Sequence, residues 1–142
     1  MITIDRIETQ KALKQAASVM LELRPQFTAD AMIKQITRQQ ANGYVLFGAF
    51  KGDDCVGVAG GVIGEKLAWG KHLYIDDLVT REDVRSEGVG EGLLTYCIEY
   101  AKTNALKSLH LDSGVQRFGA HRFYLRHEMH INSHHFALEL LE

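Results

Sequence analysis

A glycine-rich turn between a strand pattern and a helix pattern constrains this chain more than any other feature. The residues before the turn, Leu73–Val79, read LYIDDLV and predict a strand. After the turn, apolar residues recur at helical spacing: Leu93, Leu94, Cys97, Ile98 and Ala101. Gly88 and Gly90 lack side chains, so a ligand can approach the backbone N–H groups at the helix start closely. The helix dipole adds positive potential there, and the turn therefore predicts a phosphate or pyrophosphate site.

Composition excludes several classes of protein. Of the 142 residues, 46% are hydrophobic and 24% charged, which is typical of a globular protein. The formal net charge is -2, so the chain lacks the excess positive charge that would indicate a nucleic-acid partner. No apolar run approaches the ~18 residues that a membrane span needs, so no membrane partner is expected. Cys55 and Cys97 are too few for a disulfide framework or a zinc knuckle, and we expect a protein of the reducing cytoplasm.

Hydrophobic periodicity predicts one α/β domain over residues 1–142. The predicted order is strand, two helices, three strands, helix, strand, helix and strand. Pro25 predicts the end of the first helix, and Thr28 is the expected N-cap of the second. Near the C-terminus, Gln116–His127 predicts a helix and Ile131–Leu141 a final strand. This order predicts a mixed sheet.

The turn differs from two common nucleotide-binding motifs. No Lys-Ser or Lys-Thr pair follows the glycines, so the phosphate loop of the Walker type is absent. Gly88, Gly90 and Gly92 do not make the Rossmann spacing, and they follow the fourth predicted strand instead of the first. A different anionic ligand is therefore expected.

Two motifs, in the right order, resemble those of the GNAT family of N-acetyltransferases. Val79–Leu94 reads V-T-R-E-D-V-R-S-E-G-V-G-E-G-L-L and resembles the coenzyme A signature R/Q-x-x-G-x-G/A of that family. Ala120–Tyr124 resembles its A-x-x-F-Y helix. The order of predicted elements matches over essentially the whole chain. The resemblance implies a single-domain GNAT fold, with a mixed central sheet of about six to seven strands flanked by about four helices.

The same resemblance implies which residues bind acetyl-coenzyme A. The pantetheine arm would lie along Leu78 and Val79, pairing with strand backbone as an added strand would. Arg85 and Arg117 are candidates for the phosphates, although Arg117 could also serve an anionic acceptor or cap its helix. The pyrophosphate would meet the backbone of the turn: Ser86, Glu87, Gly88, Val89, Gly90 and Glu91.

The chemistry of acetyl transfer needs an acid for the departing thiolate and a base for the amine. Tyr124, in the second motif, is the expected acid. Asp112 is the first candidate for the base and Asp77 the second, with Asp76 as a further alternative. Strand alternation points Asp76 and Asp77 to opposite faces, so at most one of the two should line the acceptor groove.

Glu128 departs from the family pattern, because it stands where a glycine usually ends the A-x-x-F-Y helix. A glutamate in the left-handed conformation is strained, so we expect a reshaped helix end beside the acceptor pocket. Four nearby histidines match no zinc pattern, and no metal is expected: His127, His130, His134 and His135.

These observations predict a cytoplasmic, acetyl-coenzyme A-dependent N-acetyltransferase that acts on a primary amine, most simply a small molecule, in a ternary complex. A homodimer is possible, because the exposed edge of the sheet needs cover. Carboxylates in the groove favour a cationic acceptor and arginines an anionic one, and the sequence offers both. Two alternatives stay open: a non-catalytic coenzyme A-binding sensor or interaction domain, and a protein acetyltransferase acting on lysines or N-termini.

Overall fold

The computed structural model describes residues 1–141 as two compact units, Met1–His110 and residues 111–141. The first unit is an α/β layer structure and holds nearly all of the regular elements. In chain order it contains β1 (Ile2–Arg6), α1 (Gln10–Leu23), α2 (Ala29–Ala41), β2 (Tyr44–Lys51), β3 (Asp54–Lys66), β4 (Gly70–Thr80), the 3₁₀ helix η1 (Glu82–Glu87), α3 (Val89–Thr103) and most of β5 (Ser108–Leu111). The second unit contains α4 (Phe118–Arg126).

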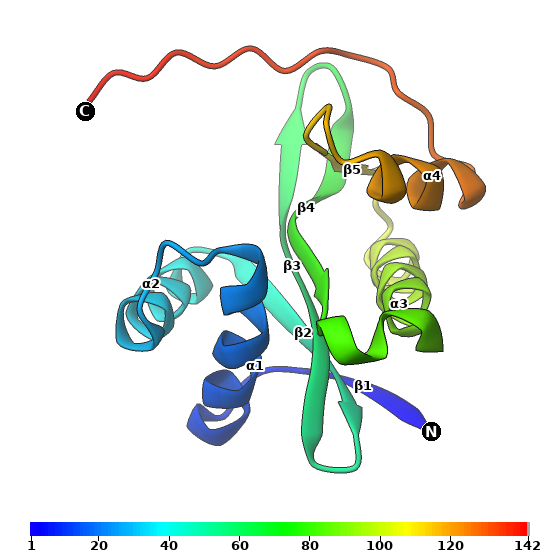
Figure 1. Cartoon of the computed structure of the whole chain (residues 1–142). Helices are drawn as coiled ribbons and strands as arrows, with labels where there is room; N and C mark the ends of the chain where they lie inside the picture. Colours follow the sequence, from blue (N-terminus) through cyan, green and yellow to red (C-terminus); the bar gives the residue numbers. More distant parts are fainter. Residues whose placement is uncertain (142) are drawn as a thin grey trace. The chain divides into compact units, whose positions relative to one another are not determined.

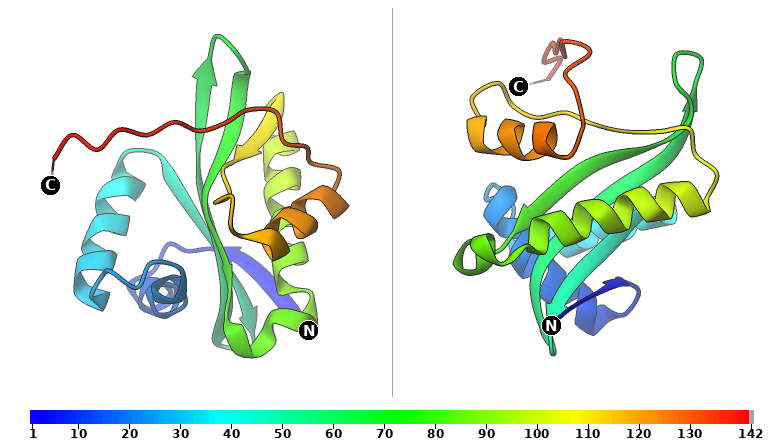
Figure 2. Two further views of the ribbon diagram at one scale, coloured as in Figure 1. Left: turned by 45° about the horizontal axis from the view of Figure 1, so that its top comes forward. Right: turned by 90° about the vertical axis from the view of Figure 1, so that its right-hand side faces the viewer.

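The five strands form one mixed sheet in the order β1-β2-β3-β4-β5. The β1–β2, β2–β3 and β3–β4 pairs are antiparallel. Helices α1 and α2 cover one face of this sheet and α3 covers the other (Figure 1). Figure 2 shows α3 lying along its face of the sheet, with α1 on the far side. The predicted α/β class with a mixed sheet is confirmed.

Strand alternation divides the core between these two faces. Leu46 is fully buried in the cluster formed with α1 and α2. The next residue, Phe47, packs its ring edge-on against Tyr96 and Tyr100 of α3, with ring centroids 5.0 Å apart in each pair. Each buried side chain of this size contributes about 1.5–3 kcal/mol. The two faces of β2 therefore hold both helical layers on the sheet.

The helix ends follow the predicted capping residues. Thr28 accepts a hydrogen bond from the Ala31 N–H at 3.2 Å, which caps α2 as expected. The C-cap of α1 is Arg24, directly before Pro25, and its N–H bonds to the Met20 carbonyl at 2.9 Å. Pro25 thus ends α1 where the sequence predicted, and Arg24 leaves the helix at the edge of the sheet layer.

A bulge in β4 overturns the predicted alternation of its two aspartates. Gly60 pairs with Asp77, but Gly61 pairs with Ile75, so Asp76 is an extra residue in the ladder. The extra residue breaks the two-residue period of the strand. Asp76 and Asp77 consequently line the same cavity, and the expectation that at most one of them would do so is wrong.

In the second unit, α4 keeps a left-handed cap despite Glu128. The φ angle of Glu128 is 66°, and its N–H bonds to the Leu125 carbonyl at 3.2 Å. The Met129 N–H bonds to the Tyr124 carbonyl, also at 3.2 Å. These two bonds make the Schellman pattern that glycine usually supports. The helix end is therefore not reshaped as expected, and Glu128 carries about 1–2 kcal/mol of backbone strain.

The predicted final strand is wrong. Within the described residues, 131–141 form no strand, so the sheet has five strands, fewer than the six to seven expected. Apolar residues do alternate along this segment, and Phe136, Leu138 and Leu140 are each more than four-fifths exposed. Periodicity shows only that a segment can form a strand, because a strand also needs a neighbouring backbone to pair with. No helix among residues 1–141 has the length and apolar character to cross a bilayer.

Candidate active site

The glycine turn runs from η1 through Gly88 into α3. Gly88 has a φ angle of 80°, which disfavours any residue with a side chain. An added Cβ there would meet open space, so the backbone conformation, not crowding, requires the glycine. Arg85, Ser86, Glu87 and Gly88 are exposed, whereas the following Val89 is fully buried. The predicted position of the glycine turn between a strand and a helix is confirmed, with one short 3₁₀ helix between the strand and the turn.

The start of α3 directs backbone donors out of the helix. N–H groups in the first turn of an α-helix have no acceptor within the helix. In α3 the Gly92 N–H bonds back to the carbonyl of the N-cap residue Gly88 at 3.0 Å. Val89 and Gly90 are the first two residues of this fifteen-residue helix, whose dipole adds positive potential at the turn. A helix start with this geometry is expected to bind an anion.

Ion pairs hold the turn and reduce its negative charge. Lys51 Nζ lies 2.6 Å from Glu87 Oε1, so the glutamate of the turn is paired. Arg81 bridges η1 and β3, because it contacts Asp83 at 2.7 Å and Asp54 at 2.9 Å. Hydrogen bonds from Arg81 lower the pKa of Asp83. These ion pairs thus hold the turn against β2 and β3 through side chains and leave its backbone exposed.

The strand that leads into the turn has an edge available for a ligand. Leu78 and Val79 pair with Ala59 and Val58 of β3 on one side. On the other side, β5 has only four residues against the eleven of β4, and the Lys107 N–H bonds near the start of β4. The last residues of β4 therefore extend beyond β5. Their main chain could take an added strand-like partner.

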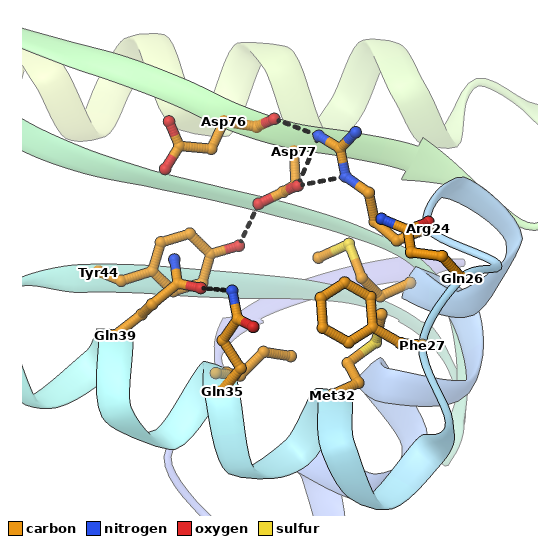
Figure 3. A pocket seen from close by; sticks show the side chains of 11 residues that line it. Arg24, Gln26, Phe27, Met32, Gln35, Gln39, Tyr44, Asp76 and Asp77 are labelled. Carbon is orange, nitrogen blue, oxygen red and sulfur yellow. Dashed lines mark hydrogen bonds and ion pairs between the residues drawn. The ribbon is translucent and has the colours of Figure 1, made fainter. Parts of the chain in front are cut away.

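A cavity of about 320 Å³ lies between the α1–α2 helical layer and the bulge of β4 (Figure 3). Three charged residues, Arg24, Asp76 and Asp77, line one side of it. The remaining lining residues are polar but uncharged or apolar: Met20, Gln26, Phe27, Met32, Gln35, Ile36, Gln39 and Tyr44. Small polar molecules bind in cavities of this size and character.

Asp77 is the centre of a hydrogen-bonded network in this cavity. The Arg24 Nε and Nη2 atoms donate to Asp77 Oδ1 at 3.1 and 3.0 Å, and Nη2 also donates to the Asp76 carbonyl at 3.0 Å. The Tyr44 hydroxyl donates to Asp77 Oδ2 at 2.7 Å (Figure 3). Burial and the negative charge of Asp77 raise the pKa of Tyr44, so its proton stays in place. Both carboxylate oxygens of Asp77 therefore accept strong hydrogen bonds from the protein itself.

Gly60 makes room for this network. A Cβ added at Gly60 would lie 1.7 Å from the Tyr44 hydroxyl and 2.3 Å from its ring carbon. No side chain fits at that distance, so the glycine allows the tyrosine to cross the sheet and reach Asp77. The neighbouring Gly61 would place a Cβ 2.4 Å from the Tyr74 carbonyl. Gly60 and Gly61 thus lie on β3 opposite the bulge of β4.

Asp76 differs from Asp77 in its surroundings. Figure 3 shows its carboxylate turned away from the Arg24 guanidinium, which touches Asp76 only through the main-chain carbonyl. Loss of solvation, followed by the negative charge of Asp77, raises the pKa of Asp76, while Arg24 opposes the shift. A carboxylate with a raised pKa is a stronger proton acceptor than an ordinary aspartate.

Tyr124 and Asp112, the first choices for acid and base, both lie in the second unit. They line one cavity of about 630 Å³ there. Asp112 forms an ion pair with His135 at 3.0 Å, and both side chains are more than half exposed. Desolvation raises the pKa of Tyr124, partly offset by Arg117, so the phenol is protonated at neutral pH. Arg117 is the N-cap residue of α4, and it makes no side-chain capping bond.

The cluster of histidines makes no metal site within the described residues. His135 pairs with Asp112, and His127 Nδ1 lies 2.8 Å from the Phe123 carbonyl. Among residues 1–141, no three His, Cys, Asp or Glu side chains come together as a metal-binding group.

Sequence reasoning missed Arg24, Tyr44 and the glutamines of α2. Arg24 and Tyr44 meet Asp77 from 53 and 33 residues away, and no local spacing reports such contacts. One signal was available, because adjacent glycines inside a strand, here Gly60 and Gly61, often indicate a bulge or a close approach.

Comparison with known families agrees with this geometry. The model of the Acetyltransferase (GNAT) family matches residues 10–129, which is most of the chain. The chain belongs to the GNAT family. It is therefore an N-acetyltransferase by class, as its sequence motifs indicated.

Several known proteins resemble this GNAT member. An uncharacterised N-acetyltransferase of Bacillus subtilis, YhdJ, is 30% identical over 125 residues, covering 87% of this chain and 88% of the relative. A crystal structure of a transcriptional regulator from Bacillus halodurans C-125 matches with a TM-score of 0.87 at 20% identity, over 99% and 100% of the two chains. The structure of AAC(6')-Iy with a bisubstrate analogue of coenzyme A matches with a TM-score of 0.86 at 12% identity, over 99% of each chain. The two structural matches show a shared fold.

Proposed function

We propose that this protein transfers the acetyl group of acetyl-coenzyme A to the primary amine of a small molecule, by direct attack within a ternary complex. The observation that carries the proposal is the turn at Gly88, which exposes backbone at the start of α3, after β4 and the short helix η1. Its sequence resembles the coenzyme A signature of the family. The AAC(6')-Iy complex, which contains coenzyme A joined to an acceptor, supports the same assignment by likeness of fold.

In the proposal, the coenzyme binds mainly through backbone. The N–H groups from Ser86 to Glu91 hold the pyrophosphate, and the pantetheine arm pairs with β4 at Leu78 and Val79. Arg85, exposed in η1, adds positive charge for the phosphates, as does Arg117. The pairing of Glu87 with Lys51 favours an anionic ligand, because it removes an uncompensated negative charge from the turn.

Asp76 takes the role of base in this proposal. The acceptor ammonium must lose a proton before its nitrogen can attack the thioester carbonyl carbon. Asp77 is a poor choice, since Arg24 and Tyr44 use both of its carboxylate oxygens. Asp76 is turned away from the arginine, and its raised pKa suits proton transfer. Asp112 is the alternative base, and the comparison of Asp76→Asn with Asp112→Asn separates the two.

Tyr124 takes the role of acid. As the tetrahedral intermediate collapses, the carbon–sulfur bond breaks and the departing thiolate accepts the phenolic proton. The raised pKa of Tyr124 keeps that proton on the phenol until it is needed. As the amide forms, the amine nitrogen loses its second proton, and this proton restores the Tyr124 phenol. The products are the acetamide and the free thiol of coenzyme A, with the first ammonium proton left on the carboxylate base.

The cysteines give no support to a covalent acyl-enzyme. Burial raises the pKa of Cys55 to about 11 and that of Cys97 to about 12. Both thiols are therefore protonated at neutral pH, and a thiol is a far weaker nucleophile than a thiolate. Direct attack by the amine needs no such intermediate.

A small-molecule acceptor is favoured over a protein by the cavity at the β4 bulge. Its volume of about 320 Å³ suits a compact ligand, and its walls come from α1, α2, β2 and β4 of one unit. The sensor alternative rested on Glu128. Because α4 keeps its usual left-handed cap at that residue, Glu128 no longer favours a protein without turnover.

Release of free thiol from acetyl-coenzyme A, measured across a panel of primary amines, tests the proposal. We expect turnover with at least one amine and a fall in kcat of about a hundredfold in Tyr124→Phe. Tyr100→Phe, half-buried on α3 against Phe47, is the matched control and should keep wild-type turnover. Binding of acetyl-coenzyme A without turnover of any amine would favour the sensor, and unchanged turnover in Tyr124→Phe would remove that residue as the acid.

The proposal includes a homodimer. Phe136, Leu138 and Leu140 alternate along an extended, exposed segment, a pattern that suits pairing with the sheet of a second copy. Sedimentation equilibrium should give twice the chain mass for the wild type and the single-chain mass when these three residues are changed to serine. A wild-type monomer at micromolar concentration would contradict the dimer.

A further inference from the structure

We propose that the acceptor is a monocation, an amine with one ammonium group on an uncharged, partly polar body. This inference rests on the proposed function and names the class of substrate that the cavity at the β4 bulge would take. Its basis is the way the three charged residues of that cavity are paired.

The charges of the cavity do not act as three independent groups. Among its lining residues, Arg24 contributes +1 and Asp76 and Asp77 contribute -1 each, so the net formal charge is -1. The pair of Arg24 and Asp77 is joined by two hydrogen bonds from the guanidinium and is closed from the other side by the Tyr44 hydroxyl. The side chain of Asp77 is only 15% exposed, whereas that of Arg24 is 42% exposed, so solvent reaches this pair mainly from the arginine side. One carboxylate, that of Asp76, is left to meet a cationic ligand.

This pairing disfavours two other classes of acceptor. An anionic acceptor would need the guanidinium fork of Arg24, but Asp77 already occupies its Nε and Nη2 donors. A dication would place its second ammonium in a cavity whose only other negative charge is neutralised by Arg24. The negative charge of an anionic acceptor and the second positive charge of a dication would each lack an oppositely charged partner. Each ligand would also lose solvation on entering the cavity.

The uncharged part of the cavity suits a polar organic body. Gln35 Nε2 donates to Gln39 Oε1 at 3.0 Å, which uses one donor and one acceptor of the two amides. Each amide has two donors and one acceptor oxygen, so the pair can present both kinds of group to hydroxyl or amide groups of a ligand. Phe27, Met20 and Met32 supply apolar surface for carbon atoms. An amino alcohol or an amine with an amide has this composition.

The charge pattern also assigns Arg24 a role in specificity. Replacing Arg24 with methionine leaves two uncompensated aspartates and a cavity charge of -2. Replacing Asp77 with asparagine leaves Arg24 against Asp76 and a charge of 0. Together with the wild type at -1, the two variants form a series in which only the cavity charge is designed to change. Arg38→Met, on the exposed face of α2, is the matched control.

A pair of probes of equal length tests the inference: 4-aminobutan-1-ol, with one ammonium, and butane-1,4-diamine, with two. The measurement is kcat/KM for thiol release with each probe, and the quantity compared is the ratio of monocation to dication. We expect the wild type to favour the monocation, Arg24→Met to lower the ratio about fivefold, and Asp77→Asn to raise it. Arg38→Met should keep the wild-type ratio. Circular dichroism and thermal melts identify a variant that fails to fold, and the other variant then carries the test.

Several results would overturn the inference. One is a wild type that prefers the diamine, and another is a ratio that neither variant moves. A third is a protein that acetylates other amines but neither turns over nor is inhibited by the amino alcohol. All three leave acetyltransferase activity in place, whereas the absence of thiol release with every amine would defeat the proposed function itself.

Discussion

The glycine turn, proposed to bind the coenzyme, and the cavity at the β4 bulge, proposed to bind the acceptor, are built on opposite principles. The turn consists of consecutive residues, 85–91, and acts through backbone N–H groups that any residue could supply once Gly88 sets the conformation. The cavity depends on side chains from four elements, and its central contacts join Arg24 and Tyr44 to Asp77 across 53 and 33 residues. We therefore expect the turn to tolerate changes in its side chains, whereas a single substitution should change the chemistry of the cavity. A protein built in this way can keep its coenzyme while its acceptor varies.

The largest expected effect that separates the two regions is that of Asp76→Asn. We expect kcat/KM for the amine to fall about a hundredfold, because the base is lost, while acetyl-coenzyme A binds as before. The raised pKa of Asp76 sets the sign of the pH dependence, since the base works only when ionised. In the wild type, kcat/KM should therefore fall as the pH drops through that raised pKa, and the variant should lack this acidic limb.

The control for this variant is Asp53→Asn, in the exposed β2–β3 turn outside the cavity, which should keep wild-type rates. A raised carboxyl pKa means that ionised Asp76 destabilises the folded state above that pKa. Asp76→Asn should therefore be at least as stable as the wild type at neutral pH. A variant that loses activity together with stability would point to a structural role instead.

Gly60→Ala should damage the cavity and leave the turn intact. The added Cβ would overlap the Tyr44 hydroxyl, and overpacking of this kind costs about 1–3 kcal/mol. We expect a lower free energy of unfolding in urea and a raised KM for the amine, with unchanged affinity for acetyl-coenzyme A. Gly92→Ala is the matched control: its Cβ would lie 3.5 Å from Ile4 Cδ1, an ordinary contact inside α3. It should stabilise the protein by about 0.5–1 kcal/mol. Equal effects of the two changes would contradict this assignment of Gly60.

Tyr44→Phe should have the smallest effect on activity of the three changes. It removes one hydrogen bond to Asp77 Oδ2 and keeps the ring and the charges in place. Loss of a bond to a charged group that is mostly buried should cost about 1.5–3 kcal/mol at most. Urea denaturation measures this loss, and the preference between mono- and dicationic amines should not move. A changed preference would mean that Tyr44 does more than hold Asp77.

The sequence predicted the parts of this protein that depend on local patterns. Thr28 caps α2, Pro25 follows the end of α1, and Gly88 stands at the start of α3, each as expected. Capping and glycine conformation are properties of a few neighbouring residues, so a single sequence reports them. The coenzyme turn was predictable for this reason.

Apart from the helix end at Glu128, the failures involve partners distant in sequence. Strand alternation did not reveal the bulge that brings Asp76 and Asp77 to one cavity, because the extra residue is defined by pairing with Gly60 and Gly61 of β3. The apolar alternation of residues 131–141 predicted a strand, but within the described residues no neighbour pairs with that segment. Arg24 looked like an ordinary helix end, and only the fold shows that it neutralises Asp77.

Titration calorimetry with acetyl-coenzyme A tests most directly the claim that the two regions act separately. The wild type should bind with a dissociation constant below the high micromolar range. Gly88→Val should weaken binding at least about tenfold, because a branched side chain at a φ angle of 80° costs about 1–3 kcal/mol. Asp77→Asn, in the cavity, should stay within about twofold of the wild type. Absence of binding to the wild type, or equal losses in the two variants, would contradict the claim.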